Sequence, residues 1–134
     1  MCKLLKQYGP LVGRILLSVI FIIAGFKKII GFSGTAGYMA SKGLPMVDVL
    51  LVLTIIIELG GGLMILLGWQ ARYAATAIFL FIIPVTFVFH PFWVEEQMNA
   101  FMKNLAIMGG MMYIMVYGSG PLSLGCDHCG KDNQ

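Results

Sequence analysis

Glu58 is the residue whose position most suggests chemistry, because its carboxyl group lies in the middle of an apolar run. Ile55, Ile56 and Ile57 precede it and Leu59 follows it. An ionisable side chain in such surroundings is costly unless it is paired or protonated. It therefore marks either a structural ion pair that fixes helix register or a pocket for a substrate, a quinone or a proton, and both interpretations stay open.

A second candidate site lies near the end of the chain, at Cys126, His128 and Cys129. Two thiols separated by two residues can cycle as a dithiol or bind a soft metal, although a structural zinc site normally has four ligands. Cys2 could supply a third thiol if both ends of the chain lie together. The alternative is a tail with no fixed ligand, and the spacing alone does not decide among these interpretations.

The elements that must position these residues are membrane-spanning helices. Hydrophobic residues make up 59% of the 134 residues and charged residues 11%, against about 45–50% and about 25% in soluble domains. A spanning helix needs about 20 mostly apolar residues, and the windows that meet this are 11–30, 46–67, 71–93 and 98–117. Their continuously apolar runs favour helices over a β-barrel, whose strands alternate.

The predicted fold is therefore an all-α membrane protein, a four-transmembrane-helix bundle. Residues 1–124 form one domain and residues 125–134 form a short polar tail that carries the CxxC sequence. Residues 31–45, rich in Gly and Ser, are expected to be a connection. Residues 68–70 form a very short one, so the helices on either side should be antiparallel neighbours. Pro84 is expected to kink the third helix.

Helix geometry predicts which polar groups lie at the same depth as Glu58. With a rise of about 1.5 Å per residue and alternating helix directions, one set of polar side chains converges in the outer half of the bundle: Lys27 or Lys28, Glu58, Lys103 and Asn104. His90 should lie near the mouth of this cluster. Arg14 lies closer to the other end, where it snorkels or pairs elsewhere. A single His in the helices argues against a metal site in the bundle.

The positive charges predict the orientation of the bundle. Five Lys and Arg residues lie on the side of the termini, and one lies on the other side once the lysines inside the helix windows are set aside. Because positively charged loops stay inside, both termini should be cytoplasmic. The sequence has no basic run of the kind that binds nucleic acid, so that class of partner is set aside.

Five motifs follow one another in a specific order. They comprise Arg14 with residues 24–28, then residues 37–40 and 43–45, then residues 58–62 with 67–68 and Arg72, then residues 89–93, and last residues 101–106. Together they resemble the DoxX family, over about residues 14–124. The positions that match the polar pattern of that family are Arg14, Lys27, Glu58, His90, Lys103 and Asn104, whereas Cys126 and Cys129 are not part of it.

The resemblance implies a four-helix, multi-pass protein of the bacterial inner membrane. The family takes its name from a subunit linked to a terminal quinol oxidase, and related proteins act in thiosulfate oxidation that passes electrons to quinone. Other members are associated with thiol redox homeostasis, in complexes with soluble redox enzymes.

The leading hypothesis is a redox-linked membrane subunit that binds quinone or docks a soluble oxidoreductase. The polar cluster around Glu58 would grip a quinone in a cleft lined by Phe79, Phe81 and Phe87, and the two tail cysteines would form a dithiol. A metal at the tail is the other cofactor considered. The alternatives are a homo-oligomeric transporter of a small solute or ion and a membrane anchor or assembly factor. The sequence has no haem-ligand pair, nucleotide loop or nucleophile–base arrangement, which favours an accessory subunit over a self-contained enzyme.

Overall fold

The computed structural model describes residues 2–89 and 93–124. Over these ranges the chain is helical apart from its turns. In chain order the elements are α1 (Cys2–Ile30), α2 (Phe32–Ser41), α3 (Val47–Ile55), the π-helical turn η1 (Ile56–Gly60), α4 (Gly61–Leu67), α5 (Ala71–Phe89), the 3-10 turn η2 (Glu95–Gln97) and α6 (Met98–Tyr117).

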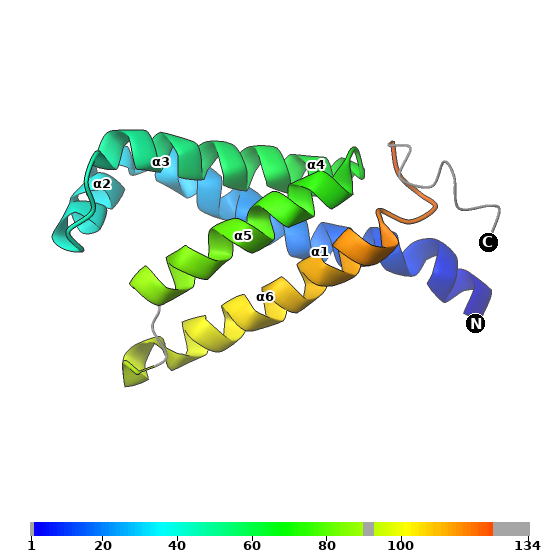
Figure 1. Cartoon of the computed structure of the whole chain (residues 1–134). Helices are drawn as coiled ribbons and strands as arrows, with labels where there is room; N and C mark the ends of the chain where they lie inside the picture. Colours follow the sequence, from blue (N-terminus) through cyan, green and yellow to red (C-terminus); the bar gives the residue numbers. More distant parts are fainter. Residues whose placement is uncertain (1, 90–92, 125–134) are drawn as a thin grey trace.

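Four stretches of the described chain are long and apolar enough to cross a membrane: Cys2–Ile30, Val47–Leu67, Ala71–Phe89 and Glu95–Tyr117. The second of them consists of α3, η1 and α4 joined end to end. The spans alternate in direction, so that α1 begins and α6 ends at the same end of the molecule (Figure 1). The predicted all-α, four-transmembrane-helix bundle is confirmed.

The helix boundaries differ from the predicted ones in three places. α1 begins at Cys2 rather than near residue 11, and it continues through Pro10. The Gly- and Ser-rich segment predicted as a connection contains α2, which packs against α3 and buries Met39. Trp93 lies in a turn and not in the third helix, whose described part ends at Phe89. The last helix has the predicted bounds, 98–117.

The turn between α4 and α5 is as short as predicted, and the two helices pack against each other as antiparallel neighbours. Gly68 and Gln70 both have positive φ angles, of 74° and 47°. A side chain at Gly68 would also collide with Arg14, since an added Cβ would lie 2.4 Å from its Nη1 atom. Glycine is therefore required here both for the backbone conformation and for space.

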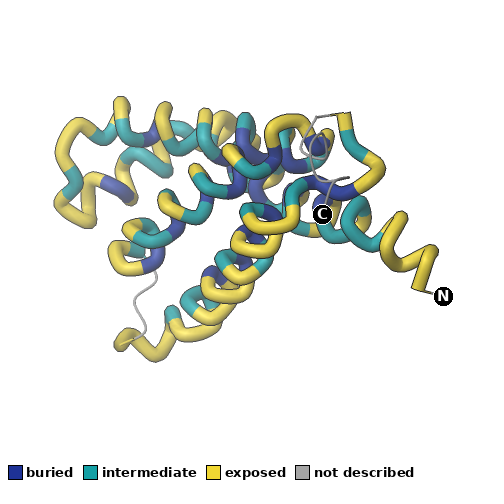
Figure 2. The backbone as a smooth tube through the Cα atoms, turned by 45° about the vertical axis from the view of Figure 1, so that its right-hand side comes forward, coloured by how far each residue is buried: buried dark blue, intermediate teal, exposed yellow. Residues whose placement is uncertain are grey.

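The apolar core lies where the helices approach one another most closely. Buried residues follow the facing sides of the helices and exposed residues the outer sides (Figure 2). Several glycines allow this approach: a Cβ added at Gly25 would lie 2.6 Å from Leu59 Cγ, and one at Gly62 would lie 3.3 Å from Phe21 Cβ. Small residues at such positions let membrane helices pack closely.

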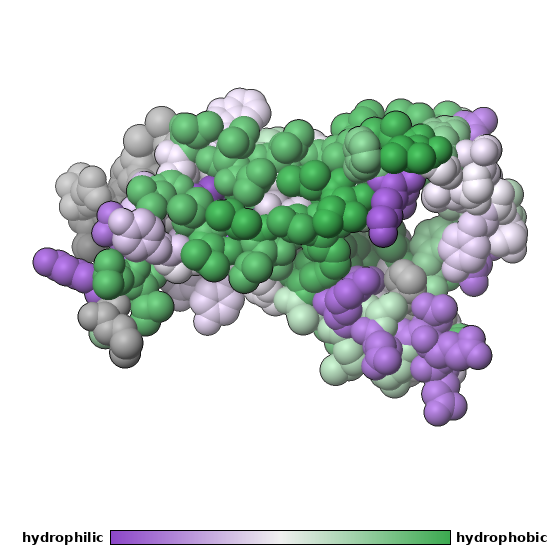
Figure 3. All heavy atoms as spheres, turned by 180° about the vertical axis from the view of Figure 1, so that it is seen from behind, coloured by the Kyte–Doolittle hydropathy of each residue, from purple (hydrophilic) through white to green (hydrophobic). Residues whose placement is uncertain are grey.

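The outer surface of the bundle exposes large apolar side chains, whereas the surface of a soluble protein is mainly polar. Large apolar side chains such as Leu16 and Leu80 are 70% and 61% exposed. Figure 3 shows apolar atoms over most of the face seen from behind, with hydrophilic residues gathered mainly at the two ends. This distribution suits a bundle whose sides face lipid chains and whose ends face water.

Candidate functional site

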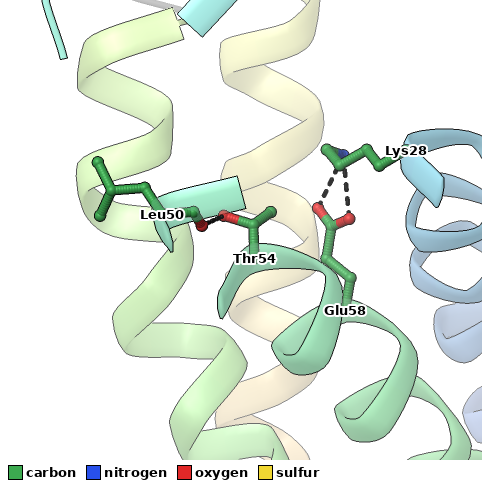
Figure 4. Close-up of polar contacts among 4 residues, drawn as sticks. All are labelled: Lys28, Leu50, Thr54 and Glu58. Atoms are coloured by element: carbon green, nitrogen blue, oxygen red, sulfur yellow. Dashed lines mark hydrogen bonds and ion pairs between the residues drawn. The ribbon is translucent and has the colours of Figure 1, made fainter. Parts of the chain in front are cut away.

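Lys28 and Glu58 form an ion pair between the first two spans. Lys28 Nζ lies 2.9 Å from Glu58 Oε2 and 3.1 Å from Oε1, and it donates a hydrogen bond to each oxygen. The two side chains point toward each other from α1 and from η1 (Figure 4). The Glu58 side chain is 9% exposed and that of Lys28 is 27% exposed. The carboxylate thus has a partner that offsets the cost of burying it.

Lys27, the other lysine considered as a partner, is exposed and does not make this contact. Successive residues of an α-helix are separated by about 100° around its axis, since each turn has about 3.6 residues. Counting residues gives the depth of each lysine along α1, and this depth is similar for Lys27 and Lys28. The packing of α1 decides which side of the helix faces the second span, and it brings Lys28 to Glu58.

The π-helical turn at Glu58 is a feature that sequence reasoning missed. Five residues, Ile56–Gly60, have this conformation in the middle of the second span. Such turns are rare and occur frequently at functional sites. The same turn packs against α1 and α5, and it therefore fixes the carboxylate among three helices. The run Gly60–Gly62, which begins at the last residue of the turn, is the hint in the sequence of an irregular backbone here.

On one side of the ion pair lies a cavity that we call the polar hollow. Its volume is about 160 Å³, and its polar lining consists of Lys28, Glu58, Lys103 and Asn104. The polar side chains that were predicted to lie at a similar depth therefore line one cavity, although Lys103 is itself exposed. Asn104 is 8% exposed, and its Nδ2 donates a hydrogen bond to Thr86 Oγ1 at 2.9 Å.

On the other side lies a cavity of about 200 Å³ that we call the aromatic hollow. Lys28 and Glu58 line it together with Tyr38, Thr54, Phe81 and Phe89. Tyr38 and Phe89 stack with ring centroids 5.6 Å apart, which joins α2 to α5 at its wall. The Thr54 hydroxyl donates to Leu50 O at 2.9 Å (Figure 4). Its oxygen keeps lone pairs that can accept a hydrogen bond.

The aromatic residues of the cleft differ from those predicted. Phe81 lines both hollows, as expected of a cleft residue. Phe79 instead packs against the apolar core, and Phe87 is 50% exposed and makes an edge contact with Phe101. Phe89 takes their place at the aromatic hollow.

Arg14 lies away from this cluster and closes the opposite end of the bundle. It is 2% exposed, so it does not snorkel. Its Nη1 donates to the carbonyl oxygens of Ile65 and Leu66 at 3.2 Å and 3.1 Å, and its Nη2 donates to that of Leu122. Ile65 and Leu66 belong to the last turn of α4, where the helix dipole favours a cation.

The remaining candidates are His90, Cys126, His128 and Cys129, and all of them lie outside the described residues. Cys2 is described, and it is exposed at the start of α1. Within residues 2–89 and 93–124, no three His, Cys, Asp or Glu side chains come close enough to hold a metal ion.

Comparison with known proteins places the chain in a family. The model of the DoxX family matches residues 9–91, which is more than half of the chain. The chain belongs to the DoxX family. The DoxX match includes Arg14, Lys28 and Glu58, and it ends before α6, which carries Lys103 and Asn104.

Two curated relatives of this DoxX protein come from Escherichia coli strain K12. The inner membrane protein YqjF is 41% identical over 123 residues, which cover 91% of this chain and 93% of the relative. The inner membrane protein YphA is 33% identical over 120 residues, which cover 85% of this chain and 86% of the relative. No solved structure matches the chain. With its four apolar spans, this DoxX protein is a multi-pass protein of the inner membrane.

Proposed function

We propose that this DoxX-family protein is a membrane subunit of a redox system and that it binds a quinone at the Lys28–Glu58 ion pair. The observation that carries the proposal is that this pair lines two hollows inside a mainly apolar bundle. A charged pair at membrane depth is costly and is most often tied to a ligand or proton pathway. A purely structural pair would need no cavity on either side.

The residues present fit a quinone head group. Lys28 Nζ has one donor beyond the two directed at Glu58, since an ammonium group carries three N–H bonds. That donor can reach a carbonyl oxygen in the aromatic hollow, and the Thr54 hydroxyl oxygen can accept from a quinol. Tyr38, Phe81 and Phe89 offer aromatic surface for a flat ring. A bound quinone would carry electrons and protons between enzymes in the membrane.

Glu58 has a separate role in this proposal, which is to hold Lys28 in place and to exchange a proton at its carboxylate. The polar hollow on its far side, with Lys103 and Asn104, provides room for water next to the carboxylate. A lone buried carboxylate would be costly, and the pair with Lys28 makes the position tolerable.

The test is extraction of lipids from the gently purified protein, followed by mass spectrometry of quinones and a titration with a short-chain quinone analogue. We expect bound quinone in the natural protein and in Lys27→Met, whose side chain is exposed, and loss of it in Glu58→Gln and Thr54→Val. Thermal unfolding of each variant shows whether it is folded. A folded natural protein that neither carries nor binds quinone would refute the proposal.

A structural role for the pair gives a different result in the same experiment. In that case Glu58→Gln would lower the melting temperature, while neither the natural protein nor Thr54→Val would bind the analogue. The two outcomes separate a quinone-binding subunit from a membrane anchor.

A further inference from the structure

Next to the aromatic hollow lies a second cavity whose lining is almost wholly apolar. This apolar groove, of about 280 Å³, lies between α3 and α5 and is lined at its outer part by Leu44, Leu50, Leu53, Ile57, Pro84 and Val88. The residues that it shares with the aromatic hollow are Met39, Thr54, Phe81, Val85 and Phe89. The two spaces therefore adjoin along a shared wall.

The apolar groove leads from the lipid-facing side of the protein toward the ion pair. Leu53 and Val88 at its rim are 50% and 37% exposed, whereas Met39, where the groove meets the aromatic hollow, is 7% exposed. In a bilayer the exposed rim faces acyl chains. A molecule can thus extend from the lipid through the apolar groove to Lys28 and Glu58.

The apolar groove differs from the aromatic hollow in what it can bind. Thr54 is the one polar side chain in its lining, and its hydroxyl hydrogen is already donated to Leu50 O. A ligand group that needs hydrogen-bond donors would find none among these side chains and would lose its own partners. A hydrocarbon chain loses nothing there, and it fills the space by dispersion contacts.

We infer that the apolar groove holds the first part of the hydrocarbon tail of the ligand whose polar head lies at the ion pair. The ligand class is then a long-tailed, membrane-dissolved quinone, and not a small water-soluble quinone or solute. This inference rests on the proposed quinone-binding function and adds to it the selection by the tail.

The experiment compares two quinone analogues that share a head group, one without a tail and one with a tail of ten carbons. Affinity for each is measured in nanodiscs with the natural protein, with Leu53→Trp and with Leu63→Trp. The indole at position 53, on the rim of the apolar groove, is introduced to block it. Leu63 is 47% exposed on α4 and lines none of the three cavities, so Leu63→Trp is the matched control.

The deciding quantity is the ratio of the affinity for the tailed analogue to the affinity for the tailless one. The tailed analogue partitions into the membrane to the same extent with every variant, so this contribution cancels when the ratios of the variants are compared. We expect Leu53→Trp to lower the ratio about tenfold, as expected for the loss of contacts to a few methylene groups, and Leu63→Trp to leave it unchanged. If Leu53→Trp does not fold, Val88→Trp on the opposite wall replaces it.

The outcomes distinguish this inference from the function on which it rests. Binding of both analogues with a ratio that Leu53→Trp leaves unchanged would overturn the inference, and it would mean that bilayer lipid fills the apolar groove. Binding of neither analogue to the folded natural protein would overturn the proposed function and the inference with it.

Discussion

Lys28 Nζ contacts both carboxylate oxygens of Glu58, at 2.9 Å and 3.1 Å, and so joins α1 to the π-helical turn of the second span. A single lysine thereby satisfies the one acidic group that the described chain buries. The same two residues line both the polar hollow and the aromatic hollow. Any change at one of them alters both the packing of the spans and the candidate ligand site.

Removal of the lysine alone should destabilise the bundle more than removal of the pair. Lys28→Met leaves the Glu58 carboxylate buried without its partner, which costs on the order of 3 kcal/mol. The double variant Lys28→Met with Glu58→Leu should recover most of this loss, because no charge remains to be buried. Thermal unfolding in detergent micelles measures the order of stability. Lys27→Met is the control, and a loss there as large as in Lys28→Met would contradict the assignment of the pair.

Substitution of Arg14 should release the segment that follows α6. Arg14→Met removes the donors to Ile65, Leu66 and Leu122, and hydrogen bonds to a charged donor contribute about 1.5–3 kcal/mol each when buried. We expect faster hydrogen–deuterium exchange at the Leu124 amide, which is bonded to Leu67 O at 3.0 Å. Lys6→Met, on an exposed part of α1, should leave exchange at Leu124 unchanged. Equal exchange in the natural protein and Arg14→Met would show that the guanidinium does not hold this segment.

Two glycines should respond in opposite ways to alanine. At Gly25 a Cβ would lie 2.6 Å from Leu59 Cγ, so Gly25→Ala forces α1 away from the second span and should cost about 1–3 kcal/mol. At Gly109 an added Cβ meets nothing within 4 Å, and Gly109→Ala should be neutral or stabilise α6 by about 0.5–1 kcal/mol. Melting temperatures of the two variants check the difference. The packing of α1 against the second span would be wrong if both variants melted alike.

Reporter fusions should place both termini in the cytoplasm. The distribution of Lys and Arg favours this orientation, and the chain enters and leaves the bundle at one end (Figure 1). We expect green fluorescent protein fused after residue 124 to fluoresce, and alkaline phosphatase fused there to be inactive. Alkaline phosphatase inserted after residue 42, at the opposite end, should be active. The reverse pattern of the two phosphatase fusions would invert the predicted orientation.

Composition is enough to predict the four spans, because bilayer thickness sets the length of an apolar helix. The bounds of α6 agree with the predicted window for this reason. α2 could not be predicted in the same way. Its Gly- and Ser-rich sequence has low helix propensity, and contacts with α3 through the buried Met39 override that propensity.

The sequence was enough to estimate how deep each candidate residue lies along its helix, but not on which side of the helix its side chain lies. Counting residues along each helix places Lys28, Glu58 and Asn104 at similar heights. It does not tell which side of a helix faces the bundle, and for this reason Lys27 and Phe87, both exposed, were expected at the site. The π-helical turn at Glu58 changes the local rotation once more, and the run Gly60–Gly62 beside it is too weak a signal to predict its conformation.

The hydrogen bond from Arg14 to Leu122 joins residues 108 positions apart, and this separation has a consequence for biosynthesis. The ribosome must have made the chain as far as Leu122 before the guanidinium of the first span can meet this acceptor. Until then the Arg14 cation lacks this acceptor, and an ionisable group in the first span makes its insertion on its own more costly. This end of the bundle is therefore sealed only after residues 122–124 have been made, although the seal depends on a side chain of the first span.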